Sequence, residues 1–300
     1  MRLYLDCGDK MEKVRFGYRN RIDKSTLTGG SWQAPLTNIQ TLRLAQRARS
    51  LNATNSSTII NIEFDKEQLI EVFSLSAHNI SVDGRVRVFA GSSLGATDLY
   101  DSGATDLYDS GETEAWPPLL STLSLHWKDY HFWCGKIEDE MRRDYQHNFI
   151  HILKDSVKTK YFRIEIFDQN NADGYVEIGR IFAGRVFEPQ FNVIYGAQLA
   201  WEDSSKIDQS LIGVEYASVT PMVRVANVNY DYSFRREALE GLYEIQRQSG
   251  TTQEVLFIGN SDDLGQMVRL SFLGRFRRIE PIKWHFMDLH STGFEIKEIL

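Results

Sequence analysis

Tyr161-Phe162-Arg163-Ile164-Glu165-Ile166-Phe167-Asp168 is the stretch of sequence that decides the fold class. Within it, apolar residues at positions 162, 164 and 166 alternate with Arg163 and Glu165. This period of two places the apolar side chains on one face of an extended chain and the charged ones on the other. Residues 84–91 (GRVRVFAG) repeat the pattern. One buried face and one solvated face are typical of an antiparallel sheet.

Further runs rich in β-branched and aromatic residues flank these two stretches. They are residues 57–64, 69–76 and 175–187, and turn-forming residues bound several of them. Together they predict a mainly β chain with an antiparallel β-sandwich over residues 57–190.

Length and composition indicate a globular protein of two domains, or of one large β domain with insertions. The chain has 300 residues, of which 42% are hydrophobic and 25% are charged, and a domain usually has about 150 residues. Its 34 Lys/Arg and 41 Asp/Glu give a net charge of −7, which excludes a generally basic nucleic-acid-binding protein.

No apolar stretch reaches the roughly 18 residues of a membrane span. Residues 1–9 lack the apolar core of a signal peptide, and two cysteines cannot build a disulfide framework, so we expect synthesis and folding in a cytosol.

The first 56 residues differ from the rest in charge. Residues 1–50 carry ten Lys/Arg against four Asp/Glu, and residues 23–41 are rich in turn formers. We interpret residues 1–56 as a basic segment and loop, which is either solvated or docked on an acidic neighbouring subunit.

Residues 92–150 are predicted to be a loop inserted into the sandwich. Residues 95–102 (GATDLYDS) recur unchanged as residues 103–110. An eight-residue period is too short for a solenoid unit, so the duplication indicates a surface loop that tolerates added length.

Residues 191–300 predict a smaller α+β domain with one main helix on a sheet. Ser233 is expected to cap a helix that ends at about Ser249, followed by Gly250. Apolar residues at positions 234, 238, 242 and 245 form one stripe of this helix. The expected strands are residues 212–232, 253–259, 266–273, 282–287 and 294–300.

The sequence contains none of the common catalytic or cofactor-binding motifs. It has no nucleophile elbow, P-loop, dinucleotide-binding glycine motif or His-Glu-x-x-His, so we expect a non-enzymatic protein without a cofactor. Residues 168–174 (DQNNADG) are rich in side-chain oxygens, and both an Asx-rich turn and a structural Ca²⁺ site are open for them.

Four residues have the spacing of zinc ligands. His131-x2-Cys134-x12-His147-x3-His151 resembles a zinc finger in which one Cys is replaced by His, and a helix would turn the last two imidazoles toward one ion. Acidic residues occupy positions 138 and 144, where a finger has apolar core residues. We therefore predict no metal and keep zinc as a minor hypothesis.

Aromatic residues of the insertion are the candidate carbohydrate-binding residues: Trp116, Trp127, Tyr130 and Trp133. A ring at the rim of a β-sandwich can cover the apolar face of a sugar. The alternative is that these rings fill a small core beneath the long loop.

An arginine-rich stretch, residues 266–284, is the candidate oligomer interface. Arg269 precedes a cluster in which Arg275, Arg277 and Arg278 surround Phe276. Guanidinium groups pair bidentately with carboxylates, which the acidic remainder of a neighbouring copy supplies. The alternative is a solvated edge strand whose arginines discourage aggregation.

Two motifs resemble those of galactose-binding-like (discoidin-type) jelly-rolls. Residues 78–88 (HNISVDGRVRV) resemble the turn and strand of that family, and residues 160–166 (KYFRIEI) resemble its late strand. The resemblance implies that the sandwich is a jelly-roll and that it contacts a glycan.

A second resemblance concerns the following residues. Residues 170–184 (NNADGYVEIGRIFAG) and 189–196 (PQFNVIYG) resemble a stretch of minor tail or tail-tip proteins of long-tailed bacteriophages, and residues 237–259 are similar to ring-forming domains of distal tail proteins. This implies a structural virion component of the tail tip or baseplate, synthesised in the host cytoplasm. It would form a homo-oligomeric ring of three or six copies with other tail or baseplate proteins and contact a host surface polysaccharide. The alternative is a carbohydrate-binding module or an accessory domain of a glycan-active system.

Overall fold

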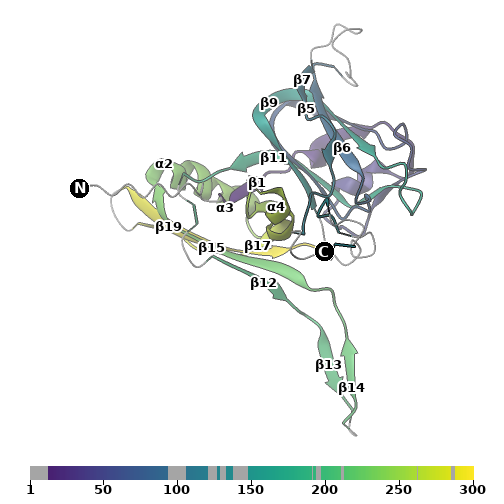
Figure 1. The fold of residues 1–300 in the computed structure, drawn as a ribbon. Helices are drawn as coiled ribbons and strands as arrows, with labels where there is room; N and C mark the ends of the chain where they lie inside the picture. Colours follow the sequence, from purple (N-terminus) through teal and green to yellow (C-terminus); the bar gives the residue numbers. More distant parts are fainter. Residues whose placement is uncertain are drawn as a thin grey trace.

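A computed structural model describes residues 13–93, 106–120, 127–128, 133–137, 148–190, 192–193, 197–210, 213–261, 263–284 and 288–300. These residues form a β-sandwich and an α+β unit, from which a two-stranded ribbon projects (Figure 1). Most strand pairs are antiparallel, and the main helix lies in the α+β unit. The predicted fold class is therefore confirmed. Among the described residues, no helix has the length and apolar character that crossing a membrane requires.

Antiparallel strands of the sandwich form one large layer and one small layer. The large layer contains β2 (Ser25–Thr28), β5 (Ile60–Ser76), β6 (Arg85–Gly91), β7 (Asp106–Asp109), β8 (Thr113–Glu114), β9 (Asn148–Phe167) and β11 (Arg180–Phe187). The small layer contains β3 (Trp32–Ala34), β4 (Ala48–Ser50) and β10 (Glu177–Ile178). The alternating apolar side chains of β6 and β9 are buried in the core between the layers, as their period of two predicts.

The sheet of the α+β unit is continuous with the large layer. Its strands are β1 (Arg15–Tyr18), β12 (Gln198–Glu202), β15 (Val223–Phe234), β16 (Glu254–Ile258), β17 (Phe272–Ile279), β18 (Lys283–Trp284) and β19 (Leu289–Glu298). The ribbon consists of β13 (Lys206–Gln209) and β14 (Glu215–Ser218). β1 pairs with β11 on one side and with β16 on the other, and it thereby joins the two units.

The main helix runs from residue 235 to residue 249 in three consecutive segments. They are α2 (Arg235–Glu237), the π-helical turn η3 (Ala238–Leu242) and α3 (Tyr243–Ser249). Ala238, Leu242 and Ile245 are buried, so three of the four stripe residues face the core, whereas Phe234 is 40% exposed. Ser233 is a buried residue of β15 and not the predicted cap.

The N-terminal segment has more regular structure than the sequence predicts. Besides β1, its residues form strands β2 to β4 and the 3-10 helices η1 (Ile22–Lys24) and η2 (Leu36–Gln40). The expectation that residues 23–41 are a loop is therefore wrong. Turn-forming residues show where the chain changes direction, but they do not exclude short strands between the turns.

Two further expectations about secondary structure are wrong. The strand expected at residues 266–273 is helical over residues 266–270, which belong to α4 (Leu264–Leu270). The Asp263 carboxylate caps the first turn of this helix, because it accepts hydrogen bonds from the N–H groups of Gly265 and Gln266. In the duplicated segment, Asp106–Asp109 forms β7 and pairs with β6, so the second copy is not entirely a loop. The first copy lies outside the described residues.

A buried ion pair spans the junction between the two units. Arg180 of β11 donates two hydrogen bonds to the carboxylate of Glu254 on β16, at 2.9 and 2.5 Å. The side chains are 0% and 3% exposed. Burial raises the pKa of the Glu254 carboxyl, and the hydrogen bonds and charge of Arg180 oppose that shift. The pair links the sandwich to the α+β sheet through side chains as well as through β1.

Candidate carbohydrate site and interaction surfaces

Trp116 is a core residue of the sandwich. Its side chain is 2% exposed, and its Nε1–H donates to the carbonyl oxygen of Ile80 at 3.0 Å. The indole therefore cannot stack on a sugar, and the prediction that Trp116 binds carbohydrate is wrong. Burial of the large apolar area of the indole in the core cluster stabilises the fold.

Two other indoles of the insertion are largely exposed. Trp127 is 74% exposed and Trp133 is 87% exposed. Tyr130, the fourth predicted residue, lies outside the described residues. The structure thus separates the aromatic residues that the sequence groups together into one buried and two exposed rings.

The residues after Trp133 anchor this part of the insertion to the sandwich. Gly135 has a φ of +64°, and its carbonyl oxygen accepts hydrogen bonds from the N–H groups of Leu119 and Leu120. Lys136 reaches the carbonyl oxygen of Val82, and Ile137 is 3% exposed in the core. Trp133 therefore lies two residues before a segment that is fixed on the sandwich.

The four proposed zinc ligands are only partly described. His131 and His147 lie outside the described residues, and Cys134 lies in an exposed turn. His151 is a residue of strand β9, where it pairs with Phe73 of β5, so it does not belong to the helix that the zinc hypothesis requires. Burial and the charge of Lys154 lower the pKa of His151.

Residues 168–174 form a hydrogen-bonded turn. The Asp168 carboxylate accepts hydrogen bonds from the N–H of Ser81 at 2.8 Å and from the side-chain amide of Asn171 at 2.7 Å. These donors use the oxygens that a cation would need, which favours the Asx-rich turn over a Ca²⁺ site.

The arginine-rich stretch does not form one surface. Arg269 lies on α4 and donates to the carbonyl oxygen of Leu119, and Phe276 is 1% exposed in the core beneath the main helix. Arg277 pairs with Glu202 at 2.7 Å and with Glu295 at 3.3 Å of the same chain. Arg275 and Arg278 are exposed on β17. The prediction that Phe276 lies at the interface is wrong, because the alternation along β17 turns it inward while its neighbours face outward.

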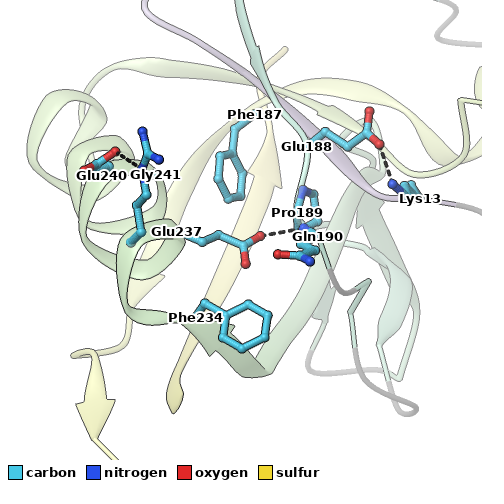
Figure 2. Close-up of a pocket in the computed structure, with 10 residues that line it drawn as sticks. Lys13, Phe187, Glu188, Pro189, Gln190, Phe234, Glu237, Glu240 and Gly241 are labelled. Atoms are coloured by element: carbon cyan, nitrogen blue, oxygen red, sulfur yellow. Dashed lines mark hydrogen bonds and ion pairs between the residues drawn. The ribbon is translucent and has the colours of Figure 1, made fainter. Parts of the chain in front are cut away.

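An open pocket of about 500 Å³ lies where the connection after β11 meets the main helix (Figure 2). Phe187 and Phe234 contribute apolar rings, and Glu237 accepts a hydrogen bond from the N–H of Gln190 at 2.6 Å. A Cβ atom at Gly241 would meet the Phe187 ring at 2.2 Å, so any other residue there would displace this ring. A ligand of this pocket would need a hydrogen-bond donor for Glu237 and an apolar part for the rings.

Sequence reasoning missed the pocket, the junction ion pair and the ribbon. The pocket and the ion pair join residues that are distant along the chain. The ribbon consists of two strands of only four residues each. The alternation of Ile207 with Lys206 and Asp208 was a signal for the ribbon, but it is too short to be distinguished from a loop.

No protein-family model and no curated protein matches the sequence. Several solved structures are similar in fold. A family 32 carbohydrate-binding module (CBM32) from a family 31 glycoside hydrolase of Clostridium perfringens is 11% identical, with a TM-score of 0.34 over 56% of this chain and 99% of the module. The family 32 module of C. perfringens NanJ, in complex with galactose, is 7% identical, with a TM-score of 0.33 over 57% of this chain and 99% of that one.

A third solved structure contains the CBM32 and alginate lyase domains of AlyQ. It is 12% identical, with a TM-score of 0.35 over 82% of this chain and 54% of that one. None of these three structures is a tail protein, so the resemblance to tail-tip proteins stays a prediction.

Proposed function

We propose that the chain is a non-catalytic carbohydrate-binding protein whose sandwich presents Trp127 and Trp133 to a sugar. The observation that carries this proposal is the exposure of both indoles, at 74% and 87%, in an insertion that is anchored to the core. Burying an indole against the apolar face of a sugar removes a large apolar area from water. The jelly-roll motifs of residues 78–88 and 160–166 agree with this function.

A glycan array probed with the full chain, followed by calorimetric titration of the best ligand, tests the proposal. Trp127→Ala and Trp133→Ala should each weaken binding by about tenfold or more, which corresponds to about 1.4 kcal/mol. Trp284→Ala is a matched control, because Trp284 is also an indole, is 73% exposed and lies in the α+β unit on β18. Absence of glycan binding, or equal losses for all three variants, would contradict the proposal.

A second candidate function is a ring-forming structural component of a phage tail tip or baseplate. The projecting ribbon and the exposed Arg275 and Arg278 favour it. Exposed apolar side chains on a projecting element and exposed arginines are both common at protein–protein interfaces. Light scattering on the full chain tests the assembly. The chain should not be divided at residue 190 for this experiment, because β1 at Arg15–Tyr18 is a strand of the C-terminal sheet. A ring of three or six copies would support this candidate, and a strictly monomeric chain would contradict it.

A further inference from the structure

The ribbon leaves the α+β sheet and extends away from both units (Figure 1). β12 pairs with β15 up to the pair Glu202–Val223, and the chain continues beyond this pair as β13 and β14. The described residues of β13 and β14 are all exposed. A two-stranded ribbon without a hydrophobic core is marginally stable in water.

The strand register divides the ribbon into two different faces. Directly paired residues of antiparallel strands lie on the same face. Ile207 lies opposite Ala217, and Gln209 lies opposite Glu215. The other face carries the pairs Lys206–Ser218 and Asp208–Tyr216.

The first of these faces, which we call the apolar face, consists of Ile207, Gln209, Glu215 and Ala217, with Val219 two residues further along. Ile207 is 69% exposed and Val219 is 81% exposed. The face combines aliphatic side chains with one carboxylate, and no Lys or Arg belongs to it. An exposed aliphatic surface on a projecting element is typical of an interface.

The outer face of the α+β sheet carries four basic residues, Arg275, Arg277, Arg278 and Lys297, beside two carboxylates, Glu202 and Glu295. The main helix covers the opposite face, where Phe276 is buried, and Arg275 and Arg277 on either side of Phe276 are exposed. Arg277 is already paired with carboxylates of its own chain. Within the part of the chain that the structure describes, Arg275 and Arg278 form no ion pair, although Glu295, which pairs with Arg277, lies opposite Arg278 in the strand register.

We propose that the apolar face of the ribbon docks on the outer face of the α+β sheet of a second copy of this chain, with Glu215 of one copy beside Arg275 and Arg278 of the next. This inference rests on the second candidate function and names the surfaces that assembly would use. A ribbon that extends away from its own sheet does not return to it, so the contact is between copies (Figure 1). It joins two different surfaces, and such head-to-tail contacts produce rings when the rotation closes.

Sedimentation velocity of the full chain, up to about 100 µM, tests the proposal because association follows mass action. In a shortened variant, an Asn-Gly turn joins Glu202 to Val223 and replaces residues 203–222, which is the connection that a tight hairpin favours. We expect the full chain to associate and the shortened variant to be monomeric with an unchanged melting temperature.

Charge exchange then identifies the surfaces. Glu215→Arg and Arg275→Glu should each weaken association by about tenfold, and the two changes in one chain should restore it. Asp208→Arg is the matched control, because it makes the same charge change on the opposite face of the ribbon and should leave association unchanged.

Each alternative outcome has a definite meaning. A full chain that stays monomeric overturns both the inference and the second candidate function. Assembly that persists in the shortened variant overturns the inference alone. An equal loss for Asp208→Arg and Glu215→Arg shows a general charge effect, and it also overturns the docking of the apolar face.

Discussion

Removing Glu254 should strongly destabilise the protein. Glu254→Ala leaves the Arg180 guanidinium, whose side chain is 0% exposed, in the core of the junction. Its remaining acceptors would be the Asp23 carboxylate at 2.7 Å and the carbonyl oxygen of Ile39 at 3.0 Å. Asn20 would also lose the carboxylate to which its side-chain amide donates.

The size of the effect follows from the burial of the pair. Removing one member of a buried ion pair typically costs about 3–5 kcal/mol, because the other charge stays buried without compensation. Asp23 is 36% exposed and still faces Arg180, so we expect the lower end, about 3 kcal/mol. That is a large part of the roughly 5–15 kcal/mol by which a folded domain is stable. Because the pair joins β11 to β16, we also expect the unfolding of the two units to become less cooperative.

Urea unfolding, followed by tryptophan fluorescence and by circular dichroism, measures both effects. Arg180→Met combined with Glu254→Met should recover most of the loss, because apolar residues of similar volume often replace a buried pair at little cost. Glu240→Ala is the control, because it breaks the exposed pair with Arg236 and should leave the unfolding midpoint unchanged. A loss below about 1 kcal/mol for Glu254→Ala would refute the argument from burial.

Three further predictions concern the sandwich. Trp116→Ala should lower the free energy of unfolding by about 3–5 kcal/mol, because it empties a core position that is 2% exposed. If urea unfolding gave Trp116→Ala and Trp133→Ala the same free energy of unfolding, this prediction would be contradicted. The pKa of His151 is lowered, so below its ordinary value of 6.5 the unfolded chain takes up a proton before the folded chain does. Stability should therefore fall as the pH decreases from 6.5 toward the folded pKa, and urea midpoints of His151→Gln should show less of this decrease than those of the parent. Deleting residues 104–111 should change the free energy of unfolding by less than about 1 kcal/mol, because the remaining copy has the same sequence as β7 and shortening a long loop costs little. A loss above about 2 kcal/mol in the same assay would show that the remaining copy does not pair with β6.

The sequence alone determined the elements whose signal is local. The alternation in residues 84–91 and 161–168 predicted β6 and the last part of β9, because neighbouring side chains of a strand must point to opposite faces. The apolar stripe and Gly250 predicted the helix at residues 235–249 to within a few residues. The mainly β class and the smaller α+β unit followed from these patterns.

Only the tertiary structure decided which residues meet. Trp116 and Trp133 are the same residue type in the same insertion, yet one is 2% and the other 87% exposed, because burial depends on the surrounding elements. Arg180 and Glu254 are 74 positions apart, and β1 pairs with β16, which follows it by more than 230 residues. The proposed docking surfaces likewise depend on the strand register, which decides which side chains of the ribbon lie on the same face. These outcomes are set by packing between distant segments, and a local pattern of residues carries no information about its distant partner.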